Sequence, residues 1–169
     1  MRWILDAYTL IYLIKAKLFK QFINLVKFPV VIDSNVNQEV VIDGKAYNYS
    51  DAFEAESLLN EFRIPIISID ASKDLFRFND AGETSCFLLA LEQGICITSD
   101  ERAYRKLLNQ NVQAIRLDTF YYENYRQNKI SKEEFLLILN KLESVYATKP
   151  KSILFFMKKL QERENNNND

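Results

Sequence analysis

Short apolar runs alternate with helical stretches through the first two-thirds of this chain, and this alternation constrains the fold most. The runs have the length of strands, while the stretches between them carry apolar residues at helical spacing. Strands joined through helices pair in parallel, and parallel sheets are covered on both faces. We therefore expect an α/β fold around a parallel sheet, with strands at residues 2–6, 28–32, 64–69, 95–98 and 113–115.

Helices are expected between these strands. The first predicted helix, at residues 9–26, is interrupted near Lys17. After the second strand, Ser34 and Asn35 are both candidate caps of a short helix, because both side chains can accept hydrogen bonds from helical amides. A turn is predicted at residues 43–45, which include a glycine.

The helix predicted at residues 81–93 should end at Gly94, because glycine often ends helices. The last three predicted helices form a C-terminal extension, 117–164, which we expect to pack on the sheet or on a second copy in a homodimer. A single domain of residues 1–164 would then precede a disordered polar tail at 165–169. The other predicted helices lie at residues 50–62, 101–109, 119–128, 131–145 and 149–164.

Composition excludes several kinds of chemistry. The chain has no histidine, so histidine-activated nucleophiles and histidine-bound zinc are excluded. Its two cysteines, Cys86 and Cys96, fall in apolar patterns and are expected to be core thiols. The formal net charge of −1 is not that of a protein that binds nucleic acid by positive charge alone.

Hydropathy and the start of the chain bear on location. No apolar stretch approaches the roughly 18 residues that a membrane span needs, so we expect no membrane partner. An acid at position 6 comes too early for a secretory signal. We therefore expect a cytoplasmic protein.

Acidic residues fall where a parallel sheet would bring them to one edge. Asp6 follows the first strand, Asp100 follows the fourth, and Glu83 lies in the first turn of the helix predicted at 81–93. Strand ends and helix starts in such a fold face one crevice. Carboxylates crowded there repel one another unless a cation holds them. Gly82, a poor helix former by about 1 kcal/mol, favours close approach of the backbone to another group. The pattern predicts a hard-metal site and phosphoryl chemistry.

Each acid also has a structural interpretation. Asp6, Asp80 and Asp100 fit helix N-caps, and Glu83 fits the last position of a capping box that begins at Asp80. Glu39, in the short helix after the second strand, would be a solvated side chain. The metal interpretation depends on the set, because every acid falls at the same topological edge.

Four segments have the order and spacing of a known family. The first is Asp6 after a strand. The other three are residues 36–40 around Glu39, Gly82-Glu83 at a helix start, and Thr98-Ser99-Asp100 after a strand. Together these segments resemble the PIN domain, and the final helices resemble a PIN subgroup of archaea and bacteria. The resemblance implies a three-layer α/β/α sandwich with a central parallel sheet and a helical C-terminal extension.

The resemblance also implies an activity. PIN domains are magnesium- or manganese-dependent ribonucleases that cleave single-stranded RNA, and many are toxins neutralised by a small antitoxin. Carried over by position, the catalytic residues are Asp6, Glu39, Glu83 and Asp100. The metal ligands are Asp6, Glu83 and Asp100, with Asp80 as an additional candidate.

This chain departs from the family pattern at two places. Two residues after the first aspartate the family usually has a small polar residue, whereas this chain has Tyr8, followed by Thr9. Glu83 would have to take the role of an aspartate that many family members carry further along this helix. These departures favour a second hypothesis, a catalytically inactive binding or regulatory module. A phosphatase of similar topology would need a second aspartate where Tyr8 stands.

Candidate substrate contacts lie beside the third acidic motif. Arg102, Arg105 and Lys106 share a helical face and are predicted to bind phosphates, with a solvated charged face as the alternative. Tyr8 and Tyr104 are candidates for stacking on bases, with ordinary packing as the alternative.

Overall fold

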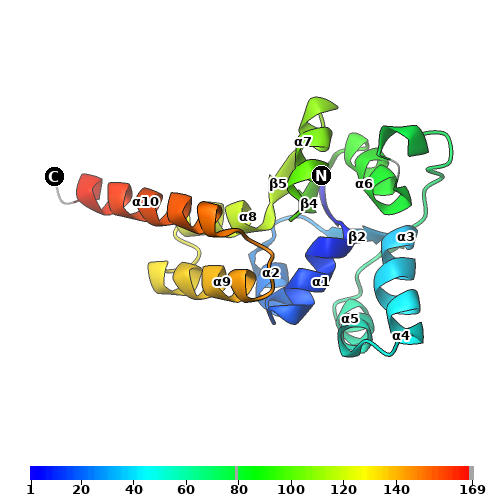
Figure 1. Cartoon of the computed structure of the whole chain (residues 1–169), viewed down its shortest axis with the longest axis horizontal. Helices are drawn as coiled ribbons and strands as arrows, with labels where there is room; N and C mark the ends of the chain where they lie inside the picture. Colours follow the sequence, from blue (N-terminus) through cyan, green and yellow to red (C-terminus); the bar gives the residue numbers. More distant parts are fainter. Residues whose placement is uncertain (79, 168–169) are drawn as a thin grey trace.

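A parallel sheet lies between helical layers in the computed structural model, which describes residues 1–78 and 80–167 (Figure 1). Within these residues the sheet has five strands in the order β3-β2-β1-β4-β5, and every pairing is parallel. The expected α/β/α architecture is confirmed. The strands are β1 (Arg2–Leu5), β2 (Val30–Asp33), β3 (Ile66–Ile67), β4 (Gly94–Thr98) and β5 (Ala114–Arg116).

The helices cover both faces of the sheet. Parallel crossovers are right-handed, so connections that leave β1 toward β2 and β3 lie on one face and those toward β4 and β5 lie on the other. Figure 1 shows α1, α2 and α5 on one side and α6 and α7 on the opposite side. The bounds are α1 (Ala7–Lys15), α2 (Phe19–Leu25), α5 (Ser50–Glu61), α6 (Ala81–Leu91) and α7 (Glu101–Asn109).

The interruption near Lys17 is confirmed, because Lys17 has a φ of 56° between α1 and α2. The predicted caps after β2 are wrong. Asp33 caps α3 (Ser34–Asn37), and its Oδ1 accepts the Asn35 N–H at 2.7 Å. An aspartate that ends a strand is thus also placed to begin the next helix.

The turn predicted at residues 43–45 is wrong as well. The chain stays helical there, through the π-helix η1 (Gln38–Asp43) and α4 (Gly44–Ala46). Gly44 is needed for space rather than for a turn, since a Cβ there would lie 2.8 Å from the Cβ of Ala52. A short 3₁₀ helix, η2 (Leu75–Arg77), precedes α6.

Gly94 does not end α6, contrary to the prediction. The helix ends at Leu91, and Gln93 takes the left-handed conformation with a φ of 77°. Gly94 is the first residue of β4, where a Cβ would lie 2.3 Å from Cδ1 of Ile4. Glycine is therefore required by close packing of β4 on β1.

The C-terminal helices pack onto the sheet through α8. Phe120 contacts the rings of Trp3 and Phe22, with ring centroids 5.6 and 5.0 Å apart. Phe135 and Phe156 lie 5.7 Å apart and join the later helices. Figure 1 shows α9 and α10 side by side, projecting from the sheet. The helices are α8 (Leu117–Arg126), α9 (Lys132–Ser144) and α10 (Pro150–Asn167).

The helix ends match the sequence pattern in part. Ser131 and Glu134 form the predicted capping box at the start of α9. The helix α10 continues through residues 165–167, where a disordered tail was expected, and residues 168–169 of that tail lie outside the described residues. Cys86 and Cys96 are free and buried, as predicted. No helix in the described part of the chain has both the length and the apolar character to cross a membrane.

Candidate active site

The site lies where the strand order reverses. β1 is central, with β2 and β3 on one side and β4 and β5 on the other, so successive crossovers diverge between β1 and β4. Leu5 is in register with Ile97, which places Asp6 next to Thr98. The Asp100 N–H donates to Thr98 Oγ1 at 3.1 Å. Ligands of open parallel sheets bind beyond the strand ends at such a switch point.

Each of the three aspartates caps a helix with one carboxylate oxygen. α1 begins at Ala7 rather than near residue 9, so Asp6 stands directly before it. The structural interpretation therefore holds for all three, but capping uses only Oδ1 of each side chain. The N–H donors, all at 2.7 Å, belong to Thr9 for Asp6, Glu83 for Asp80 and Ala103 for Asp100.

The Asp6 carboxylate is buried without a cation. Its residue is 6% exposed, and no ion pair joins it to a lysine or arginine in the described chain. Burial raises the pKa of the Asp6 carboxyl, and the charge of Asp100 raises it further, whereas hydrogen bonds with Thr98 and Thr9 lower it in part. A buried charge that the protein leaves uncompensated is one that an external cation would stabilise.

Glu83 faces the same group of charges from α6. Burial raises the pKa of Glu83, and the charges of Asp80, Asp100 and Asp6 raise it as well. Lys106 acts in the opposite direction, with its Nζ 3.8 Å from Glu83 Oε2. Glu83 does not complete a capping box, since only the Asp80 side chain takes part in the α6 cap.

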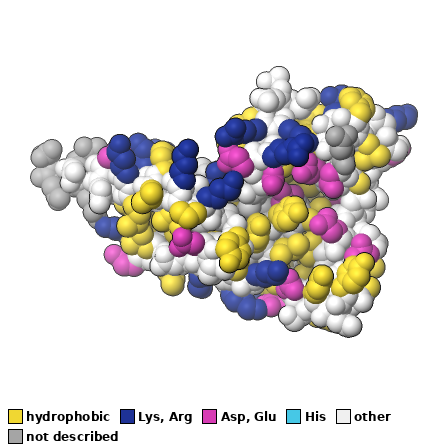
Figure 2. All heavy atoms as spheres, in the orientation of Figure 1, with side chains coloured by type: hydrophobic (Ala, Val, Ile, Leu, Met, Phe, Trp, Pro, Cys, Tyr) yellow, Lys and Arg dark blue, Asp and Glu magenta, His cyan; other side chains and the backbone are white. Residues whose placement is uncertain are grey.

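Glu39 approaches the site from η1. Its side chain reaches solvent, yet partial desolvation raises the pKa of Glu39, and the charges of Asp80, Asp6 and Asp43 raise it further. Asp6 and Asp80 thus act on the pKa of both Glu39 and Glu83, and Asp100 acts on those of Asp6 and Glu83. Figure 2 shows acidic side chains gathered on this face, bordered by Lys and Arg.

The donor chemistry of this carboxylate cluster suits a hard divalent cation. Carboxylate oxygens are the usual protein ligands of Mg²⁺ and Mn²⁺, and mutual repulsion among them would fall when a cation binds. In residues 1–78 and 80–167, no three acidic or thiol side chains are close enough to hold a metal ion as they stand. The acids are therefore neighbours, but they do not form a closed coordination shell.

An open groove of about 700 Å³ adjoins Asp100. One wall comes from α7, where Arg102, Arg105 and Lys106 all line the groove. Arg105 is paired with Glu101 at 2.9 Å, and Lys106 also donates to a backbone carbonyl at 3.2 Å. Arg102 is exposed, and no ion pair or hydrogen bond engages its guanidinium in the part of the chain that the structure describes.

Comparison with known proteins identifies the family. A family model, DUF3368, described as a PIN domain, matches residues 2–116, which include the whole sheet and all five acids. The chain belongs to the PIN-domain family. Proteins of this family are generally nucleases. No curated protein matches the chain.

Solved structures also match the chain. One of them is a domain of a functionally unknown protein from Methanocaldococcus jannaschii, 16% identical to this chain, with a TM-score of 0.49. The match covers 69% of this chain and 90% of the other. At this level of similarity the neighbour carries no argument about function.

The departures from the PIN pattern have distinct structural outcomes. Tyr8 is 54% exposed and lines the groove. Thr9 is buried, and its hydroxyl donates to the Ile97 carbonyl at 3.1 Å, so it supports the strand ends. A Cβ at Gly82 would meet no atom closer than 3.4 Å in the described chain, so no neighbouring protein atom requires glycine there, and the close backbone approach stays a prediction. Tyr104 does not line the groove.

A buried aspartate at the end of β2 and the second wall of the groove were not singled out from the sequence of this PIN domain. Asp33 is fully buried at the end of β2, and its Oδ2 has no hydrogen-bond partner among the described residues. Its position after an apolar run was the available signal. Tyr146 and Lys149, between α9 and α10, form the second wall of the groove. No sequence pattern indicated that these two residues lie near the acidic motifs, because they are far from them along the chain. The packing of the C-terminal extension decides where they lie.

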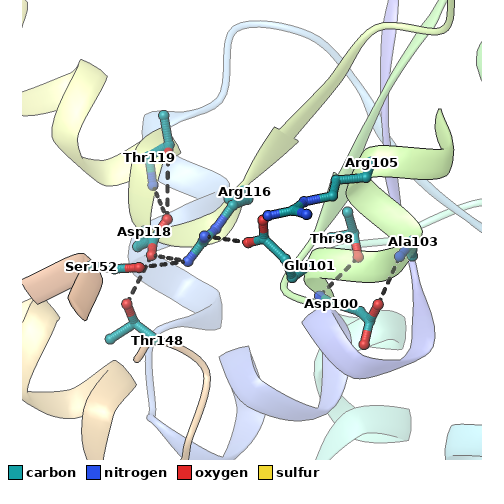
Figure 3. Close-up of polar contacts among 10 residues, drawn as sticks. All are labelled: Thr98, Asp100, Glu101, Ala103, Arg105, Arg116, Asp118, Thr119, Thr148 and Ser152. Carbon is teal, nitrogen blue, oxygen red and sulfur yellow. Dashed lines mark hydrogen bonds and ion pairs between the residues drawn. The ribbon is translucent and has the colours of Figure 1, made fainter. Parts of the chain in front are cut away.

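A polar network fixes the second wall against the PIN domain (Figure 3). The Arg116 guanidinium donates to Glu101 at 2.8 Å, to Asp118 at 2.6 Å and to Ser152 of α10 at 3.0 Å. Asp118 also accepts the Thr148 hydroxyl at 2.8 Å. The network ties Glu101, the first residue of α7, to Thr148 and Ser152, which flank Lys149 of the second wall.

Proposed function

We propose that this PIN domain is a magnesium- or manganese-dependent endoribonuclease that cleaves phosphodiester bonds in single-stranded RNA. One observation supports the proposal above all. Carboxylates from four segments gather at the switch point of the sheet, and Asp6, the most deeply buried of this set, has no basic partner in the described chain. A bound cation would offset this repulsion and keep the carboxylates ionised.

Asp6, Glu83 and Asp100 would hold the cation, with Asp80 as a further ligand and Glu39 orienting a water. When bound, such an ion lowers the pKa of water and offsets charge on the phosphate. The N-cap hydrogen bonds hold Oδ1 of Asp6 and of Asp100. The second oxygen of each carboxylate would then be available to the cation. The raised pKa of Glu83 or Glu39 makes either carboxylate a suitable proton acceptor from the attacking water.

The three basic residues of α7 would contact the substrate. Arg102 is free to bind a phosphate, whereas Arg105 and Lys106 would exchange or share their present acidic partners.

A toxin role would add a small antitoxin protein as the inhibitor of this site. Expression of the chain in cells would test the toxin role. A toxin should arrest growth, the product of a neighbouring gene should relieve the arrest, and the Asp100→Asn chain should cause none.

The test is cleavage of a fluorescent single-stranded RNA with Mg²⁺ or Mn²⁺. Asp6→Asn and Asp100→Asn should each lower the rate by about a thousandfold, since each removes several kcal/mol of charge stabilisation. Glu92→Gln is the matched control, because Glu92 pairs with Arg2 at the opposite edge of the sheet. Equal rates in the native chain and both aspartate variants would refute the proposal.

A binding or regulatory module is the second candidate. It is favoured by the lack of a ready three-ligand group within the described residues. The two candidates differ in their response to metal alone. Calorimetric titration with Mn²⁺ should release or absorb heat if the acids form a metal site, and the Asp100→Asn chain should give none. Absence of heat in the native chain would favour the module.

A further inference from the structure

We propose that the groove between α7 and the α9–α10 connection is the path of the RNA strand, with bases stacked on Tyr8 and Tyr146 and phosphates held by Arg102 and Lys149. The inference rests on the proposed function and extends it to residues outside the matched family region, which ends at residue 116. The groove opens beside Asp100, so a strand lying in it would reach the carboxylates.

Two exposed aromatic rings line the groove. Tyr8 of α1 is 54% exposed, and Tyr146 of the second wall is 89% exposed. Tyr12 backs Tyr8, with ring centroids 6.2 Å apart. Rings held open to solvent along one groove are a platform on which bases of any identity can stack.

The backbone of Tyr146 is unusual for an aromatic residue. Its φ is 63°, in the left-handed region just after α9, where glycine or asparagine is normally found. The other described residues with positive φ are lysine, arginine, glutamine and asparagine; Tyr146 is the one aromatic among them. The tyrosine costs stability at this position, and a stacking role for its ring accounts for its presence.

Unpaired cations lie on both walls. Neither the Arg102 guanidinium nor the Lys149 ammonium has a side-chain partner in the described chain, and both residues are exposed. Figure 2 shows Lys and Arg side chains along the hollow between α10 and the sheet. Cations alternating with aromatic rings match the alternating phosphates and bases of a single strand. Carboxylates of a protein partner would pair with these cations as well, so the interleaving of cations with exposed rings is what favours a single strand.

The experiment measures binding of a fluorescein-labelled 12-nucleotide oligouridylate to the full chain by anisotropy, in EDTA to prevent cleavage. Tyr146→Gly should weaken binding about tenfold, the loss expected for one stacked base. The same change should raise the melting temperature, because glycine relieves the left-handed strain. Tyr146→Phe should bind like the native chain. A purely structural role would not couple higher stability to weaker binding.

Lys149→Ala should weaken binding severalfold. It should also reduce the slope of log affinity against log salt concentration by the amount that corresponds to about one phosphate contact. Two exposed controls lie off the groove: Tyr47→Ala, on a residue 71% exposed, and Lys158→Ala, further along α10. Both should leave affinity unchanged. A duplex of the same length should bind more weakly than the single strand, since paired bases cannot stack on the rings.

The outcomes separate this inference from the proposed function. Binding that depends on Tyr146, in a chain that cleaves nothing with Mn²⁺, would support the path and refute the nuclease. Metal-dependent cleavage together with native affinity in both Tyr146→Gly and Lys149→Ala would refute the path and keep the nuclease. No oligouridylate binding by the native chain would also refute the path and favour a protein partner for this groove.

Discussion

Two buried aspartates in this molecule have opposite surroundings. Asp118 is 1% exposed and accepts hydrogen bonds from Arg116, Thr148 and the backbone N–H of Thr119, at 2.6, 2.8 and 2.7 Å (Figure 3). Asp6 is 6% exposed, receives its backbone hydrogen bond from α1, and faces other acids instead of a cation. The protein compensates the charge of Asp118 internally, whereas it gives Asp6 no basic partner in the described chain.

Under the proposed function, this difference separates a carboxylate that stabilises the fold from one that would hold a cation. A compensated buried carboxylate stabilises the fold and becomes costly to remove, since its partners would be left unpaired. An uncompensated one costs stability, which a protein tolerates where a ligand restores the balance. Four predictions test the comparison.

The largest effect should come from Asp118→Ala. Removing this carboxylate leaves part of the Arg116 network unpaired, so the free energy of unfolding should fall by about 3 kcal/mol. Urea denaturation measures the change. Glu143→Ala, on an exposed side chain of α9, should change little. A loss no larger than in this control would show that the network does not hold the C-terminal helices.

The second effect is stabilisation by metal. Mn²⁺ at a hundred times its dissociation constant should add about 2.7 kcal/mol to the native chain, because it binds the folded state only. Thermal melting with and without Mn²⁺ measures this shift. It should persist in Glu92→Gln and vanish in Asp100→Asn. An equal shift in Asp100→Asn would place the ion elsewhere.

The third effect has the opposite sign to the first. Asp6→Asn, without metal, should raise the free energy of unfolding by about 1 kcal/mol, because the amide oxygen still accepts the Thr9 N–H while the buried charge is gone. Urea denaturation at pH 7 measures it. If Asp6→Asn proved as damaging as Asp118→Ala, the two aspartates would have the same structural role.

The smallest effect is on pH dependence. The pKa values of Asp6, Glu39 and Glu83 are raised in the folded chain, so folding favours their protonated forms. Their contribution to stability is full below the ordinary values of 3.8 and 4.5 and is lost as pH rises through the raised values. Without metal, melting temperatures should rise as pH falls from 7 toward 5. Asp6→Asn should flatten this slope, whereas Glu92→Gln should retain it.

The sequence predicted the sheet and most helices because apolar periodicity reports directly which face of a segment is buried. It also located the acids at one edge, since a parallel sheet brings all strand ends together. It failed at Gly94 and Gly44, where glycine is required by a neighbouring side chain rather than by a turn. Such contacts come from residues distant in sequence, which local patterns do not reveal.

What the sequence determined by itself is the order of elements and the family, both encoded in local spacing of apolar and acidic residues. What the tertiary structure decided is which charges are compensated and which are not. Asp118 and Asp6 look alike in sequence, each beside the start of a helix. Arg116 and Thr148 converge on Asp118, whereas Asp6 has the charges of Asp100 and Glu83 in its surroundings. Side chains meet in these ways only when the crossovers and the C-terminal helices have packed.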